Sequence, residues 1–358
     1  MKSFTGEVRI VGAGLLGTSI GLALTKQGID VAISSKSTKS VDLAVGYGAG
    51  RAVREDDSPK LIVVCVPPQL TPQVVAEELI AFPEAIVTDV ASVKAGILAE
   101  LERLSAPVER YVGSHPMAGR ERGGAIAGRA DLFVGRPWVI TPNVKSDDSG
   151  IKLVAALAEA LESSVVTVSP KDHDRAVALV SHVPQLVSSL LAARLVDAKN
   201  DDVALAGQGL RDTTRIAASD PDLWVQILSA NSAEVLQVLR SLSADLATVI
   251  GALDNLDSEK AIAQLRHALE AGNIGVEKIP GKHGTKHSTY AQIIVMIDYK
   301  PGELARLLTE VGEIGINLEE LKLEHSPSAQ IGLVELYVLP SAEAALIADL
   351  QKRGWRIA

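Results

Sequence analysis

The sequence predicts an α/β protein, because its texture changes twice and divides the chain into three parts. In residues 1–169, short β-branched apolar runs alternate with helical patterns, as in βαβ units around a mainly parallel sheet. Residues 170–272 carry long helical patterns with no strand signal between them. After a linker rich in Gly, Pro and Lys at 273–288, residues 289–358 return to alternating strands and helices.

The composition fits a folded protein and excludes several classes of function. Apolar residues make up 47% of the 358 residues and charged residues 22%, which argues against a disordered chain. The formal net charge is −9, so the chain lacks the positive surplus that binding to nucleic-acid phosphates requires. We see no signal-peptide pattern and no uncharged apolar stretch near about 18 residues. We therefore expect a cytoplasmic protein that binds neither nucleic acid nor a membrane.

The first part contains seven predicted strands and four named helices. Aromatic residues are only 3% of the chain, so its core must consist of Ala, Val, Leu and Ile, which suits helices packed on a buried parallel sheet. We expect strands at Glu7–Val11, Asp30–Ser34, Leu61–Val66, Ala85–Asp89, Arg110–Ser114, Pro137–Thr141 and Val165–Val168. We expect helices at Leu15–Gln27, Thr71–Ala81, Val93–Leu104 and Gly150–Glu162.

A glycine-rich turn joins the first predicted strand to the first helix. Gly12 permits a tight turn, Gly14 lets the backbone approach a pyrophosphate, and Gly17 lets the helix lie close to the sheet. The helix N-terminus adds free N–H groups and the positive end of its dipole. The pattern predicts a Rossmann-type dinucleotide-binding domain, with cofactor contacts from Gly12, Gly14, Leu15, Leu16, Gly17, Val66 and Pro67.

The end of the second predicted strand indicates which dinucleotide binds. An NAD enzyme usually carries Asp or Glu there, to bond the ribose 2′-hydroxyl, whereas this chain has Ser34 and Ser35 followed by Lys36. Two hydroxyls, Lys36 and Lys39 suit a 2′-phosphate through charge-assisted hydrogen bonds. We therefore predict that Ser34, Ser35 and Lys36 bind NADP, with NAD as the alternative cofactor.

The second part is expected to be all-helical, with helices at Asp172–Ala198, Pro221–Ser243 and Asp245–Ala271. Each carries Leu, Val and Ala on one face. Such Ala-rich helices bury little area singly, so we expect them to bind substrate and to interlock with a second copy as a homodimer.

The third part has a compact pattern of its own. We expect strands at Tyr290–Asp298, Asn317–Glu324, Gly332–Leu339 and Trp355–Ile357, with helices after Pro301-Gly302 and at Ala342–Lys352. This βαββαβ order resembles the ACT domain, a small regulatory module that binds amino acids.

Four motifs in the first two parts occur in a fixed order, at Thr88–Lys94, Gly113–Gly119, Ser181–Gln185 and Arg211–Ala217. Together they resemble the prephenate/arogenate dehydrogenase family of tyrosine biosynthesis. The resemblance implies oxidative decarboxylation of prephenate to 4-hydroxyphenylpyruvate, with hydride transfer to NAD(P)+. The alternative is an NADP-preferring conversion of arogenate to tyrosine. It further implies that tyrosine is the effector of the ACT-like part.

Two residues are expected to be catalytic. His115 follows a predicted strand at the carboxyl edge of the sheet, where ligands bind in such folds. A neutral imidazole there can accept the proton of the substrate's 4-hydroxyl group. The resemblance implies that Ser92 hydrogen-bonds to that hydroxyl and to His115. A plain helix N-cap is the alternative role for Ser92.

The resemblance also implies a set of substrate contacts. Arg215 matches the family's carboxylate-binding arginine, a side chain suited to a bidentate pair. Arg211 lies four residues earlier and would share a helix face with it. Glu121 and Asp212 match acidic positions that pair with this arginine near the entrance of the site.

The helical part supplies the remaining candidates. The resemblance implies that His182 contacts the substrate's side chain, the alternative being a structural core histidine. Gln185 stands where many prephenate-specific relatives carry His, and its amide suits the ammonium of arogenate, which leaves the substrate open. We expect His173, beside Asp174, at a helix end or interface, and Trp224 in packing near the site. No metal site is expected.

Two other classes of protein fit these residues less well. One is another hydroxyacid or imine dehydrogenase with a helical second domain, a class that lacks this combination of motifs. The other is an amino-acid-sensing protein whose nucleotide domain is only a scaffold, for which His115, Ser92 and Arg215 would be unnecessary.

Overall fold

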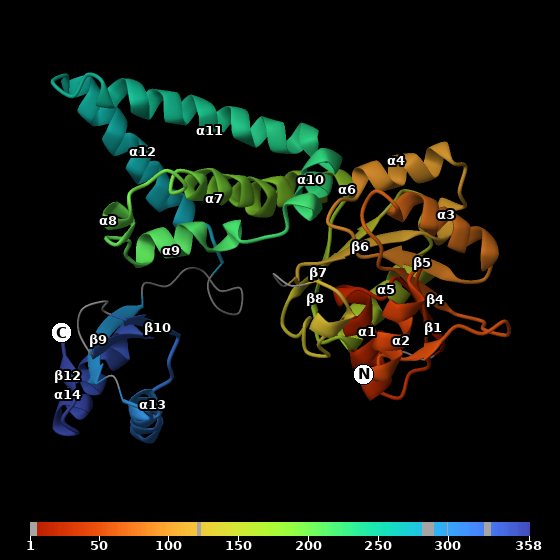
Figure 1. Cartoon of the computed structure of the whole chain (residues 1–358), viewed down its shortest axis with the longest axis horizontal. Coiled ribbons are helices and arrows are strands. Elements are labelled where there is room, and N and C mark those ends of the chain that lie inside the picture. The colour runs from red at the N-terminus through yellow and green to blue at the C-terminus, as the bar shows by residue number, and fades with distance from the viewer. Residues whose placement is uncertain (1–5, 120–122, 281–289, 299, 326–330) are drawn as a thin grey trace. The chain divides into compact units, whose positions relative to one another are not determined.

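The computed structural model describes residues 6–119, 123–280, 290–298, 300–325 and 331–358 (Figure 1). The chain forms two compact units, Met1–Ser243 and Ala244–Ala358. The dinucleotide-binding elements and all the described candidate site residues belong to the first unit.

A five-stranded parallel sheet forms the centre of the first unit, in the order β3-β2-β1-β4-β5. Its strands are β1 (Val8–Val11), β2 (Val31–Ser34), β3 (Arg51–Ala52), β4 (Leu61–Val64) and β5 (Ile86–Asp89). The strand order reverses between β1 and β4, and a ligand crevice opens at the carboxyl ends of strands at such a reversal.

Helices cover both faces of this sheet. Leu61 and Val63 join the apolar cluster that contains α1 (Leu15–Lys26) and α5 (Asp148–Ala160). Ile62 and Val64 face the opposite cluster, which contains α3 (Thr71–Ala81) and α4 (Ala95–Arg103). Figure 1 shows α3 and α4 beside each other. Burial on both faces explains why β4 is a continuous apolar run rather than an alternating one.

The last three strands of the first part form a second sheet, which corrects the predicted topology. β6 (Val112–Pro116) pairs antiparallel with β7 (Pro137–Pro142), and β7 pairs parallel with β8 (Ser164–Thr167). One parallel bridge, between Val87 and Tyr111, joins β5 to the start of β6. The described part of the link from β6 to β7 holds only a 3₁₀ turn, so there is no helical crossover to return β7 in parallel.

The seven predicted strands are confirmed to within two residues at each end. Two elements were not predicted, the two-residue strand β3 and helix α2 (Thr38–Gly46). The N-cap of α2 is Ser37, whose side chain accepts a hydrogen bond from the backbone N–H of Ser40.

The second part is helical, as predicted, but its boundaries differ. The first predicted helix consists of α6 (Pro170–Val177), a π-helical turn (Ala178–His182) and α7 (Val183–Ala193). Short helices α8 (Asn200–Val203) and α9 (Gln208–Thr214) follow, and a 3₁₀ turn (Arg215–Ala217) comes after α9.

The longer predicted helices were divided at the wrong places. α10 (Pro221–Ala230) ends at Asn231, and α11 (Ser232–Leu253) runs through the predicted break at 243–245, which contains neither Gly nor Pro to stop it. The helix α12 (Glu259–Glu277) continues past residue 273, the predicted start of the linker.

Two helical runs, Pro170–Ala193 and Ser232–Leu253, are long and apolar enough to cross a membrane by length and composition. This corrects the expectation that the chain has no such stretch. Core helices of soluble proteins pass the same test, and the first run carries buried polar side chains that are hydrogen-bonded within the protein.

The C-terminal sheet of the second unit has the predicted βαββαβ order. Its elements are β9 (Ala291–Asp298), α13 (Glu303–Ile314), β10 (Glu320–His325), β11 (Ile331–Val338), α14 (Glu343–Lys352) and β12 (Arg356–Ile357). The sheet is antiparallel in the order β10-β11-β9-β12, with an apolar core that includes Val295, Leu307 and Leu350.

Candidate functional site

A chain of hydrogen bonds starts at His115 on β6. Its Nδ1 lies 2.9 Å from Nε2 of His173, and Nδ1 of His173 lies 2.8 Å from Oδ1 of Asp174. The two rings meet edge to face, with centroids 5.1 Å apart. His173 is only 1% exposed and lies in the first turn of α6, so of the two expected places, a helix end or an interface, it takes the helix end, as a buried partner of His115.

The carboxylate of Asp174 caps helix α4. Its Oδ1 and Oδ2 accept hydrogen bonds of 2.8 Å from the backbone N–H groups of Lys94 and Ala95, respectively. A helix N-terminus stabilises negative charge placed there. This contact replaces the alternative in which Ser92 caps the helix. Ser92 is partly exposed and its hydroxyl has no hydrogen bond within the described residues.

A second buried cluster fixes β6 against β5 just before His115. The ammonium of Lys94 forms an ion pair with Asp89 and donates to the backbone carbonyl of Ser114 at 2.7 Å. Tyr111 donates to the Asp89 carboxylate, and Ser114 donates to the Asp89 carbonyl, each at 2.8 Å. Burial lowers the pKa of Lys94 and raises the pKa of Tyr111 well above its ordinary value. These contacts fix the backbone just before His115 to the end of β5.

The imidazole of His115 is suited to act as a base. Burial lowers its pKa well below the usual value, and the positive charge of the nearby Lys94 lowers it further. Its Nε2 has no hydrogen-bond partner in the described part of the chain, and the residue is partly exposed. A neutral ring with one free nitrogen can accept a proton from a bound alcohol.

His182 joins the same network through Asn231. The Asn231 side-chain nitrogen donates 2.8 Å to the Asp174 carbonyl and lies 3.1 Å from Nδ1 of His182. Because a carbonyl only accepts, this contact fixes the amide orientation, and Nδ1 of His182 must be the acceptor. Burial lowers the pKa of His182 to about 4, so its ring is neutral at pH 7 with the proton on Nε2.

Trp224 lies beside His182, edge-on with the ring centroids 6.2 Å apart. His182 ends the π-helical turn, a distortion that often marks functional positions in helices. Gln185, one turn later on α7, is buried and donates to Ser189 at 3.4 Å. His182 thus belongs to the hydrogen-bonded network that contains His115, and Gln185 lies near it along the helix.

The basic candidates are not drawn into this network. Arg215 begins the 3₁₀ turn after α9 and is exposed, as is Arg211, and neither forms an ion pair with any described residue. The expected pair of Arg215 with Asp212 is not formed, and Asp212 instead accepts a hydrogen bond from Gln208 at 2.9 Å. Glu121 lies outside the described residues.

The glycine loop has the geometry that a dinucleotide requires. Gly12 has a φ of 117°, and a Cβ there would lie 2.2 Å from the Cys65 carbonyl oxygen. A Cβ on Gly17 would lie 2.0 Å from the carbonyl oxygen of Gly12, whereas one on Gly14 would meet nothing within 4 Å. Packing therefore requires Gly12 and Gly17. Gly14 keeps an open face at the N-terminus of α1, in front of Leu15 and Leu16.

The end of β2 offers a further group to a nucleotide. The hydroxyl of Ser34 is buried without a hydrogen-bond partner among the described residues, and the Ser34 carbonyl accepts from Gly12 at 2.7 Å. Ser35 accepts from the Ser37 backbone, and Lys36 is exposed. Val66 and Pro67 follow β4 at the point where the strand order reverses. The unpaired hydroxyl fits a ligand that supplies its missing partner.

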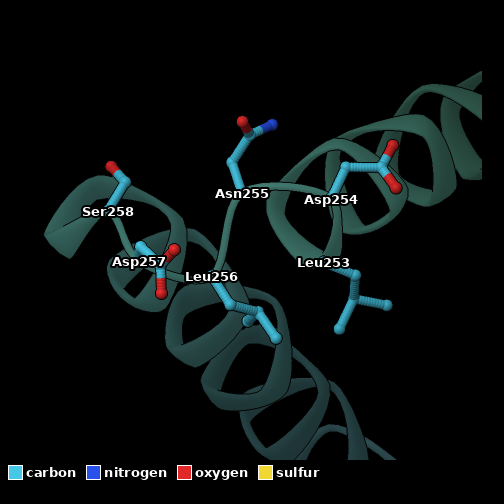
Figure 2. A pocket seen from close by; sticks show the side chains of 6 residues that line it. All are labelled: Leu253, Asp254, Asn255, Leu256, Asp257 and Ser258. Atoms are coloured by element: carbon cyan, nitrogen blue, oxygen red, sulfur yellow. The ribbon is translucent and has the colours of Figure 1, made fainter.

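A surface depression elsewhere has no such convergence. It lies at the turn between α11 and α12 and is lined by Leu253, Asp254, Asn255, Leu256, Asp257 and Ser258. Figure 2 shows these side chains pointing in different directions. The described residues contain no cluster of His, Cys, Asp or Glu that could hold a metal ion.

Five residues of the network were not assigned to the site from sequence, namely Asp89, Lys94, His173, Asp174 and Asn231. Asp89 and Lys94 lie within the motif Thr88–Lys94. Charged residues at the end of a predicted buried strand could have indicated that they belong to the site. Asn231 is one of several polar residues within a predicted helix, so the sequence gave no comparable signal for it.

Comparison with known proteins connects this geometry to a family. Residues 20–167 match the model described as "Prephenate dehydrogenase, nucleotide-binding domain". Residues 169–268 match "Prephenate dehydrogenase, dimerization domain". A relative from Streptomyces niveus, "Probable prephenate dehydrogenase NovF", is 34% identical over 97% of this chain and 98% of its own. The cyclohexadienyl dehydrogenase of Zymomonas mobilis is 30% identical over 74% of this chain and 94% of its own.

Solved structures agree with these matches. The prephenate dehydrogenase of A. aeolicus, in complex with hydroxyphenyl propionate and NAD+, is similar with a TM-score of 0.67 and 27% identity. The similarity covers 77% of this chain and 100% of that one. The arogenate dehydrogenase of Synechocystis has a TM-score of 0.63 and 28% identity, over 75% of this chain and 99% of its own.

Proposed function

The chain belongs to the prephenate dehydrogenase family, and we propose from this premise that it converts prephenate to 4-hydroxyphenylpyruvate with NAD(P)+. The neutral imidazole of His115, with a free Nε2, is the observation that carries the proposal. When bound, the nicotinamide accepts the hydride from the carbon that bears the 4-hydroxyl. Nε2 of His115 takes the hydroxyl proton as the C=O forms. Loss of CO2 makes the ring aromatic as a phenolate, which takes a proton back from His115 to give the 4-hydroxyphenyl product.

The site contributes binding and orientation around this base. The Nε2–H of His182 is a donor beside Trp224, and Gln185 supplies an amide one turn later. We assign Ser92 to a hydrogen bond with the substrate hydroxyl, which its unpaired side chain permits. Arg215 and Arg211 are assigned to the substrate carboxylates, with Asp212 and Glu121 near the entrance.

The substrate and the cofactor are tested together by measuring initial rates for prephenate and arogenate, each with NAD+ and NADP+. We expect prephenate with NADP+ to give the highest kcat/KM. The unpaired Ser34 hydroxyl, exposed Lys36 and absence of a carboxylate at the end of β2 support NADP. The buried neutral amide of Gln185 favours the second candidate, arogenate. A preference for NAD+ would refute the cofactor proposal, and turnover of neither substrate would refute the reaction.

Arg215→Ala is expected to raise KM for prephenate about 10- to 100-fold, as loss of a charged hydrogen-bonded pair does, while kcat changes little. The contact acts equally in the ground state and the transition state, which is why KM carries the effect. Steady-state kinetics at saturating cofactor give both constants. Arg103→Ala, which removes an exposed guanidinium paired with Glu100 on α4, is the control. An unchanged KM would place the carboxylates elsewhere.

We also propose that the protein is a cytoplasmic homodimer that associates through its helical part. The match of residues 169–268 to a dimerization domain supports this, as do the exposed apolar residues of α11, namely Leu236, Leu242, Leu246, Ile250 and Leu253. Sedimentation that shows a monomer at micromolar concentration would contradict it.

The ACT-like part is proposed to bind tyrosine as a feedback inhibitor. A pocket beside β9 supports this, because it combines the ion pair of Asp298 and Lys300 with the apolar side chains of Ile297, Leu304 and Leu323. We expect deletion of the residues after Gly284, a cut outside the described residues, to abolish inhibition by tyrosine and leave turnover intact. Rates measured against tyrosine concentration test this, and unchanged inhibition would exclude the tail as the sensor.

A further inference from the structure

The role of His115 as a base depends on which of its ring nitrogens carries the proton. Its Nδ1 faces His173, and its Nε2 is the nitrogen without a partner among the described residues. Only the tautomer with the proton on Nδ1 leaves a lone pair on Nε2 for a substrate hydroxyl. That tautomer needs a hydrogen-bond acceptor 2.9 Å away, at Nε2 of His173.

Asp174 determines that His173 can be this acceptor. A carboxylate accepts hydrogen bonds, so the 2.8 Å contact with Asp174 places the proton of a neutral His173 on Nδ1 and leaves a lone pair on Nε2. The carboxylate cannot turn away easily, because both its oxygens also bind the backbone of α4. Asn231 holds the same residue by its carbonyl.

We propose that His173, oriented by Asp174, is a positioning residue that sets the tautomer of His115 and stabilises the imidazolium formed in the reaction. The proposal rests on the proposed function, in which His115 is the base. The substrate proton moves to Nε2 of His115. The Nδ1 proton of His115 stays in place and is donated to His173, and the Nδ1 proton of His173 stays and is donated to Asp174. This arrangement extends by one ring the Asp–His orientation known in hydrolytic triads.

Two amide substitutions that differ by one methylene group separate this role from packing. In His173→Gln, the amide oxygen reaches the position of Nε2 and can still accept from His115. In His173→Asn, the amide reaches only the position of Nδ1, so it can bond to Asp174 but leaves His115 without an acceptor. If His173 only filled space, the smaller Asn would lower the stability of the fold more than Gln, but the two folded variants would have the same kcat.

We expect His173→Asn to lower kcat about 10²-fold or more, within the range for misoriented bases, and His173→Gln to recover about 10-fold of that loss. KM for the substrate and the dissociation constant of NADP should change less than kcat in both variants. Equal kcat values for the two variants, with both proteins folded by circular dichroism, would overturn the proposal.

Nuclear magnetic resonance of the full-length wild-type protein, with ¹⁵N-labelled histidine, gives a readout that needs neither a variant at His173 nor turnover. The His115 signals are assigned by their absence in His115→Asn. At neutral pH we expect the proton of His115 on Nδ1, and a proton on Nε2 instead would overturn the proposal. If the protein turned over neither prephenate nor arogenate, the proposed reaction would be refuted. The position of the His115 proton would still show whether His173 sets the tautomer.

Discussion

Replacing His115 with Asn is expected to lower kcat by about 10²–10⁴-fold, the usual contribution of a general base, while NADP still binds. The imidazole of His115 keeps a free nitrogen near the end of β6 in the described structure, and the cofactor loop lies on other elements. Rates followed at 340 nm and titration of the cofactor by fluorescence measure the two effects. His267→Asn, which alters an exposed histidine of α12, should leave both unchanged. Undiminished turnover would refute the mechanism.

A comparison of the pH dependence of activity in the wild-type protein and in His115→Asn gives an independent check. Burial lowers the pKa of His115, so the neutral base is present at pH 7 and activity should fall only when the pH drops below about 6.5. The groups that face the ring are His173 and Asp174 on α6, Lys94 before α4 and His182 in the π turn. In His115→Asn the residual rate should lose this acid limb, and a limb that persisted unchanged would assign it to another group.

Gly17→Ala is expected to lower the stability of the fold, whereas Gly14→Ala is expected to lower only the affinity for the cofactor. The new Cβ at residue 17 would lie 2.0 Å from the Gly12 carbonyl oxygen, so α1 must move from the sheet. We expect a loss of at least about 1–3 kcal/mol in the free energy of unfolding, as overpacking costs, together with weaker cofactor binding. At residue 14, where φ is −88° and no atom lies within 4 Å of a Cβ, stability should be unchanged.

For Gly14→Ala we expect NADP affinity to fall about 10-fold or more, since the methyl group occupies the space that a pyrophosphate needs beside the helix N-terminus. Thermal unfolding and cofactor titration of both variants separate the two outcomes. Wild-type affinity in the Gly14 variant would show that the pyrophosphate binds elsewhere.

Much of the first unit could be predicted from sequence because its signals are local. The run at 61–64 is apolar since helices cover both faces of the sheet, and the glycine loop is explained by close approaches between backbones. The reversal at β7 could not be predicted, because it depends on how the link after β6 packs. The helix ends near 243 and 273 were misplaced because neither region contains a residue that forbids a helix.

The site was predicted only in part, for the same reason. His115 and His182 stood out within motifs, but the contact of His115 with His173 joins residues 58 positions apart. It exists because α6 packs against α4 and against β7, the strand paired with β6, and periodicity in the sequence does not report such tertiary packing. Arg215 was paired with Asp212 by motif matching alone, and the described structure gives Asp212 a local partner instead.

The carboxylate of Asp174 has two structural roles. It accepts the hydrogen bond of His173, and it caps the N-terminus of α4 through two backbone N–H groups. A substitution at Asp174 that is meant to change the basicity of His115 would therefore also destabilise the N-terminus of α4. His173 contacts Oδ1 of that carboxylate and forms no hydrogen bond with α4 in the described structure. It is the position at which the two properties can be varied separately.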